Sequence, residues 1–150
     1  MTLEFLNLFF AGILAGLELS IHYGVHVPTV ALDERPQIVL RQGLVRRLRW
    51  LVPAFFVPTA LLGSLATVLD GDEPGVAFRG AAILALVVWM VVRFAGTVRI
   101  NSATLAWNPD APPKDWREQI GTVEQFHVVG TWSAVLAFGF FLSAVASRIP

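Results

Sequence analysis

The sequence predicts an all-α fold, an integral membrane bundle of four transmembrane helices. Of the 150 residues, 55% are hydrophobic and 15% are charged, a balance more apolar than that of soluble domains. Four apolar segments each approach the roughly 20 residues needed to cross the hydrocarbon core of a bilayer. They lie at about 3–28, 48–69, 76–98 and 126–147. Because these segments fill most of the chain, we expect one domain over residues 1–150.

Lys and Arg residues are distributed unequally between the two sides of the predicted membrane. The connections after the first and third segments hold eight of them, and the opposite side holds two. Because basic residues of short loops stay in the cytoplasm, we expect the N- and C-termini outside and these connections inside. Trp50, Trp107 and Trp116 fall at the cytoplasmic boundary, where aromatic rings favour the headgroup region. The eight are Arg35, Arg41, Arg46, Arg47, Arg49, Arg99, Lys114 and Arg117, and the two are Arg79 and Arg148.

A proline-rich connection over 107–116 precedes the fourth segment, and prolines cannot donate hydrogen bonds to regular structure. Asp115 and Glu118 follow with the spacing of a capping box, in which each side chain accepts a backbone N–H from the other position. The fourth helix is therefore predicted to span 116–147, beginning outside the membrane near Trp116.

Composition excludes several classes of function. The chain has no cysteine, which excludes disulfides and thiolate metal ligands. Its formal net charge is zero, which argues against a nucleic-acid partner, since such proteins concentrate basic charge to meet phosphates. Small residues at Ala11, Gly12 and Gly16 allow helices to approach closely, and they leave open both packing within one bundle and a homo-oligomer.

The most informative feature is a set of ionisable side chains inside the first apolar segment. Glu18, His22 and His26 are spaced four residues apart, and at 100° per residue they lie within about 80° on one helix face. Ionisable groups at this depth are energetically expensive unless they pair, bind an ion or face a cavity, so they are functional candidates. His26, near the end of the helix, is expected to be an optional, interfacial member. Glu4 and Asn7, near the outer boundary, are expected to be solvated.

Two other segments carry polar residues at the same depth. The sequence therefore predicts one polar pocket at the cytoplasmic end of the bundle, and bundle cores are common places for cofactor and metal sites. A structural role stays open, since an Arg93–Glu18 ion pair could serve only to fix the helix register. The third segment contributes Arg93, Thr97 and Asn101, and the fourth contributes Glu124, His127 and Thr131.

An ordered set of short motifs covers nearly the whole chain and resembles the anthrone oxygenase family, small four-helix membrane proteins of fungal and bacterial aromatic polyketide pathways and of a large, mostly uncharacterised bacterial set. The resemblance implies a multi-pass protein of the bacterial inner (plasma) membrane that converts an anthrone to an anthraquinone with O₂. Family members often have Arg-Trp before the histidine of the fourth helix and an arginine three residues after it, where this chain has Thr122-Val123 and Gly130. The motifs are Gly16-Leu17-Glu18, His22-Tyr23, Arg47-Leu48, Asn101 with Trp107 and Pro109, Pro112-Pro113-Lys114-Asp115-Trp116, and His127.

One chemistry for these residues needs no metal. An anthrone or phenolic substrate, small, apolar and aromatic, would lose a proton to His22, because an imidazole exchanges protons near neutral pH. Glu18, one helical turn away, would orient the ring and stabilise its cation. Asn101 or Arg93 would stabilise the developing oxyanion. The resulting enolate can reduce O₂, the co-substrate, by itself.

A second chemistry uses the same side chains as metal ligands. Two histidines and a carboxylate with open positions are a layout of O₂-activating iron, and imidazoles also suit copper. Glu18, His22 and His127 would bind the ion, with His26 as a tentative further ligand. The competing class is a non-enzymatic membrane subunit that binds or carries a metal or a haem, since two histidines of a bundle can ligate haem iron.

Overall fold

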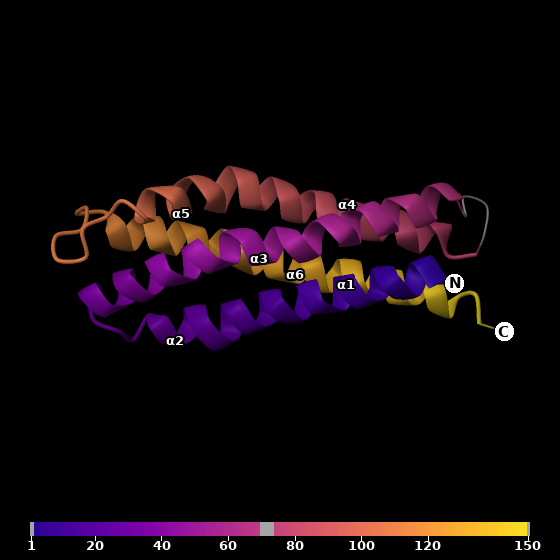
Figure 1. Cartoon of the computed structure of the whole chain (residues 1–150), viewed down its shortest axis with the longest axis horizontal. Helices are drawn as coiled ribbons and strands as arrows, with labels where there is room; N and C mark the ends of the chain where they lie inside the picture. The colour runs from indigo at the N-terminus through magenta and orange to yellow at the C-terminus, as the bar shows by residue number, and fades with distance from the viewer. Residues whose placement is uncertain (1, 70–73, 150) are drawn as a thin grey trace.

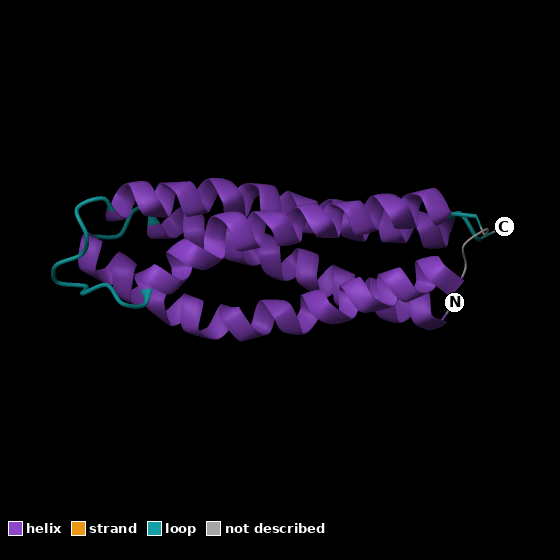
Figure 2. Ribbon diagram, turned by 90° about the horizontal axis from the view of Figure 1, so that it is seen from above, coloured by secondary structure: helices purple, strands orange, loops and turns teal. Residues whose placement is uncertain are grey.

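The computed structural model describes residues 2–69 and 74–149, which form four long helices in an antiparallel bundle (Figure 1). Each helix is long and apolar enough to cross a membrane; their spans are Thr2–Thr29, Glu34–Leu69, Val76–Thr104 and Trp116–Ala146. The described residues contain no strand (Figure 2). The predicted all-α class with four membrane-spanning helices is therefore confirmed.

Two of the four helices change their winding near one end. The first consists of α1 (Thr2–Leu19), the π-helix η1 (Ser20–His26) and α2 (Val27–Thr29). The third consists of α4 (Val76–Val92), the π-helix η2 (Arg93–Val98) and α5 (Arg99–Thr104). The second and fourth are the single α-helices α3 (Glu34–Leu69) and α6 (Trp116–Ala146). The arginine-rich stretch 37–49 thus belongs to the same helix as the apolar segment that follows it.

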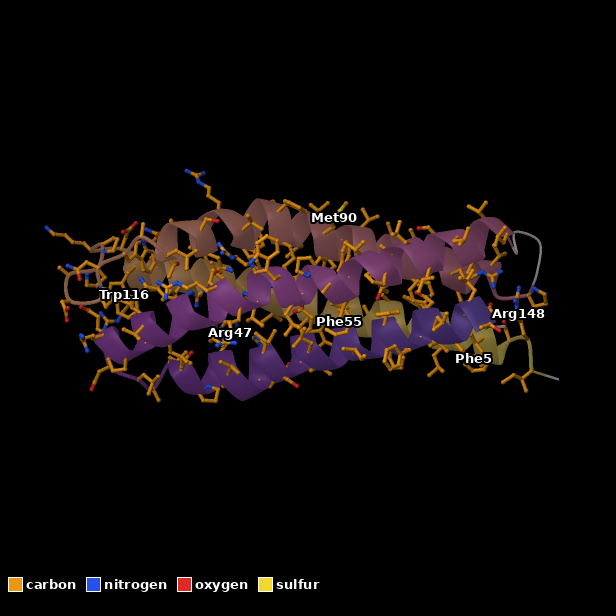
Figure 3. All side chains as sticks on the ribbon, in the orientation of Figure 1. Phe5, Arg47, Phe55, Met90, Trp116 and Arg148 are labelled. Carbon is orange, nitrogen blue, oxygen red and sulfur yellow. The ribbon has the colours of Figure 1, made fainter. Side chains whose placement is uncertain are left out.

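The four helices form a ring in which every neighbour is antiparallel. α1 packs on α3 and α6, and α4 packs on the same two helices from the opposite corner. Short connections favour this up-and-down arrangement. Arg148 lies at the end of the bundle that holds both termini, and Trp116 lies at the other end, called here the loop end (Figure 3). Which end faces the cytoplasm stays a prediction.

The core of the bundle is narrow because small residues line it. Ala11, Ala82 and Ala137 are each at most 2% exposed and let the helices approach closely. Leu14, Leu86 and Phe141 fill the space between them, so an apolar layer occupies the middle of the bundle. Large apolar side chains cover the outside instead, as lipid contact requires. Examples are Phe9, Leu61, Leu84 and Phe94.

Two expectations about the start of α6 are wrong. Asp115 precedes α6 but makes no capping bond; its carboxylate accepts a hydrogen bond from the Gln119 side chain at 2.9 Å instead. Trp116 is 4% exposed and donates its indole N–H to Glu34 at 3.1 Å, so the fold buries it against α3. A buried indole with a partner needs no headgroup contact.

Glu4 and Asn7 are buried rather than solvated. Glu4 Oε1 lies 3.1 Å from Arg79 Nη1 and 3.1 Å from Arg148 Nη1. The two basic residues of the predicted outer side therefore pair with one buried carboxylate. A small cavity beside Asn7 is lined in part by Glu4 and Arg79. The start of α1, which the sequence places at the bilayer boundary, is thus held by ion pairs within the protein.

The close approach of α6 to η2 requires a glycine. A Cβ atom built on Gly96 would overlap the ring of Phe126, so we expect Gly96→Ala to separate these elements and to destabilise the protein by about 1–3 kcal/mol. Gly139→Ala in α6 is the matched control, because nothing lies within 4 Å of its added Cβ. Thermal unfolding in detergent measures both variants. Equal midpoints for Gly96→Ala and Gly139→Ala would contradict the packing described.

Candidate functional site

Arg93, the first residue of η2, is the centre of a buried polar cluster between the apolar layer and the loop end. Its Nη2 pairs with Oε2 of Glu18 from α1. Its Nη1 lies 2.6 Å from Nδ1 of His127 from α6. The Glu18 side chain is completely buried, and that of Arg93 is 12% exposed. One guanidinium therefore connects three helices.

Trp89 contacts both members of this ion pair, although it was not among the site residues predicted from the sequence. Its indole Nε1–H donates to Glu18 Oε1 at 3.0 Å, so both carboxylate oxygens have partners. Arg93 Cζ lies 5.2 Å from the Trp89 ring, a cation–π distance. Phe56 of α3 stacks on the indole, with ring centroids 4.3 Å apart. Trp89 precedes Arg93 by one helical turn, and that spacing could have identified it.

The Arg93 contact determines the state of His127. Arginine carries only donors and stays protonated in proteins, so the nitrogen 2.6 Å from its Nη1 must accept the hydrogen bond. His127 is therefore neutral, with its proton on Nε2. This tautomer is assigned from the donor that faces the ring. His127 Nε2 lies farther from the same Arg93 nitrogen, at 3.4 Å, which makes Nδ1 the better placed acceptor.

His26 belongs to the cluster, and its depth in the membrane stays a prediction. Its side chain is 7% exposed, and its Nδ1 lies 3.2 Å from Oε1 of Glu124 in α6. The His26 ring contacts the His127 ring, with centroids 4.6 Å apart. Arg41 of α3 donates to the same Glu124 oxygen at 3.1 Å. The cluster therefore continues from the ion pair toward the loop end.

Asn101 lies at the loop-end edge of this cluster. Its Oδ1 accepts a hydrogen bond from Arg41 Nη2 at 3.3 Å. Asn101 has no described contact with Glu18 or Arg93, so the structure separates it from the ion pair with which it was grouped. Thr97 is also engaged elsewhere, because its hydroxyl donates to the carbonyl oxygen of Arg93 within η2 at 2.8 Å.

His22 lies in η1, four residues from both Glu18 and His26. Its side chain is buried, and its Nδ1 has no hydrogen-bond partner within the described part of the chain. The edge of the ring packs on Tyr23, with centroids 4.6 Å apart. Both oxygens of Glu18 are occupied by Trp89 and Arg93, so Glu18 does not orient His22 as expected. This Nδ1 nitrogen makes His22 the candidate base of the site.

The π-helices explain how His26 joins the cluster. A π-turn contains more residues than an α-turn, so each residue rotates the chain by less than the 100° assumed from the sequence. Residues four apart in η1 therefore return more nearly to the same direction. His22 and His26 stay on the side of Glu18, and η2 does the same for Arg93 and Thr97. π-Turns within α-helices occur frequently at functional sites.

Gly130 is the position where the resembled family often has arginine. An added Cβ at Gly130 would lie 3.4 Å from Arg93 Nε and 3.5 Å from its Cζ. The Arg93 guanidinium of η2 therefore occupies the space beside Gly130, next to His127.

The predicted metal ligands do not fit a metal in this arrangement. The described residues contain no group of three His, Asp or Glu side chains placed to hold one ion. Glu18 and His127 both bind the Arg93 cation, which occupies the place between them. The contacting rings of His26 and His127 also leave no room for a haem between them.

Comparisons with family models, with curated proteins and with solved structures find no match to this chain.

The ion pair predicts a specific pattern of stabilities. Arg93→Gln leaves a fully buried carboxylate without its cation, and we expect it to lower the free energy of unfolding by about 3–5 kcal/mol. Glu18→Gln leaves the cation unpaired and is expected to have a similar effect. The double variant removes both charges, so it should be more stable than the sum of the single effects predicts, by about 1–3 kcal/mol. Denaturant unfolding in micelles measures this coupling, and strict additivity would show that the pair is not formed.

Proposed function

We propose that this chain is a membrane-embedded oxygenase that uses O₂ to oxidise a small, apolar aromatic substrate with an acidic C–H or a phenolic O–H group. The observation that carries the proposal is the buried Glu18–Arg93–His127 chain inside an apolar span, with the unpartnered base His22 on the same side of the first helix. Deprotonation to an oxyanion needs both a base and a fixed cation. Ionisable groups retained within a membrane span support a functional site.

Anthrones, the substrate class that the family resemblance suggests, fit this pair of groups. His22 takes one proton from the central CH₂, and the enolate passes one electron to O₂. The two radicals combine to form a C–O bond, and the resulting peroxide anion takes back the proton from His22 to give a hydroperoxide. Loss of the second C–H proton and cleavage of the O–O bond leave a ketone and water. One oxygen atom enters the product, and the other leaves as water with the two hydrogens of the CH₂.

Arg93 stabilises the enolate oxygen in this scheme. Its Nε has no hydrogen-bond partner among the residues described, so it has a donor left for a ligand. Glu18 and Trp89 hold the guanidinium before substrate arrives, and a preorganised donor does not have to reorient during the reaction. The role of Glu18 is thus to position Arg93. Because the carboxylate and His127 are committed to this cation, the proposal takes the metal-free form.

The apolar layer favours an enzyme over a membrane carrier. Leu14, Leu86 and the alanines around them lie between the Arg93 cluster and the Glu4–Arg79 cluster at the other end. Among the described residues, ionisable groups therefore do not form a continuous chain from one end of the bundle to the other. A carrier needs such a path or an alternating opening, whereas an enzyme of apolar substrates needs one accessible polar site.

The proposal is tested by O₂ consumption in membranes that contain the protein, with emodin anthrone and related phenols as substrates. His22→Gln removes the base and is expected to lower the turnover number by about 10²–10⁴. Glu18→Gln releases Arg93 and is expected to lower it by about 10²–10³.

Glu4→Gln is the matched control for Glu18→Gln. Glu4 is also a buried α1 glutamate paired with arginine, but it lies beyond the apolar layer. Its variant should lose stability and keep the turnover number per folded molecule. The proposal fails if no substrate is oxidised by the unaltered protein, or if oxidation survives both His22→Gln and Glu18→Gln.

A further inference from the structure

The arginines of α3 divide into two kinds. Those nearest the loop end are paired, since Arg35 Nε lies 2.6 Å from Asp110 Oδ1 and Arg41 binds Glu124. Arg46, Arg47 and Arg49 follow within one turn, and all three are exposed; Arg47 is labelled in Figure 3. None of the three forms an ion pair with any residue in 2–69 or 74–149. The unpaired arginines require an explanation beyond the bundle itself.

Hydrogen bonds between α3 and the third helix place these arginines level with the predicted membrane boundary. Gln42 Nε2 donates to the carbonyl oxygen of Thr104 at 3.0 Å, and Arg41 bonds Asn101. In an antiparallel pair with this register, residue 46 lies near the level of Arg99. Arg99 follows directly on the predicted apolar segment 76–98. Arg46 is therefore level with the point where the neighbouring helix leaves the apolar region.

Arg46, Arg49 and Trp50 form one face of α3, since residues three and four apart lie side by side on a helix. Trp50 is 71% exposed, and Arg49 Cζ lies 5.4 Å from the centroid of its ring. Two unpaired like charges one turn apart destabilise a helix, and an anion between them reverses that effect. An exposed tryptophan at a membrane boundary favours the headgroup region.

We infer that the Arg46–Arg49–Trp50 face binds the phosphate of an anionic phospholipid headgroup. Guanidinium groups match the geometry of phosphate oxygens with paired N–H donors. Basic residues beside a membrane helix attract anionic lipids. Lipid is the source of phosphate at this level, because the face lies at the boundary of the bilayer and not in the loops. This inference is independent of the proposed oxygenase activity.

Native mass spectrometry of the full chain in detergent, with phosphatidylglycerol or phosphatidylcholine added, tests the inference. Phosphatidylglycerol should bind more tightly, and Arg46→Gln/Arg49→Gln should weaken its binding about tenfold. Arg35→Gln/Arg117→Gln is the control, because it removes the same charge from two exposed arginines paired with Asp110 and Glu34. That control should bind phosphatidylglycerol as the unaltered chain does.

Three outcomes would overturn the inference. Equal binding of the two lipids would show that the face does not select an anion. Equal losses in both double variants would show that only net charge matters. Displacement of the lipid by the same concentration of soluble glycerol phosphate would identify a site for a free phosphate compound rather than for a membrane lipid.

Discussion

A guanidinium that cannot lose its proton lies buried within the apolar span, and the arrangement of the bundle around it follows from that constraint. Arginine stays charged in proteins, so the fold must surround Arg93 with acceptors. Glu18 supplies the counter-charge from α1, and His127 supplies a neutral acceptor from α6. Trp89 supplies a ring face and the second partner of Glu18. These contacts fix the relative depth of three helices.

Both ends of the bundle contain a buried glutamate–arginine ion pair, but we assign a different role to each. Glu4 with Arg79 and Arg148 closes the end that holds the termini. Around Arg93, π-turns in two helices change the local winding, and η1 carries the buried side chains of His22 and His26. His22 Nδ1 and His26 Nε2 have no hydrogen-bond partner among the described residues, and a buried polar atom without a partner is costly. These histidines, which the Glu4 cluster lacks, are the reason we assign the proposed chemistry to the Arg93 cluster.

Hydropathy was sufficient to predict the four helices, and spacing on one face was sufficient to find Glu18, His22 and His127. The Arg93–Glu18 pair was one alternative that the sequence offered, but the sequence did not indicate that Trp89 and His127 share it, because these contacts depend on how three helices pack. His26 was expected to be optional from its place near the helix end, whereas packing against α6 brings it to His127 and Glu124. Gly130 is a further case, since only the fold shows that Arg93 fills the space beside it.

The central claim is that Arg93 donates to Nδ1 of His127 and keeps this ring neutral within the membrane. The ¹⁵N chemical shifts of the His127 ring, measured on labelled protein in bilayers at neutral pH, test it directly. The structure predicts a deprotonated, hydrogen-bonded Nδ1 and a protonated Nε2, with the Nδ1 signal shifting in Arg93→Gln. A ring protonated at both nitrogens, or at Nδ1 alone, would contradict the arrangement on which the proposed site depends.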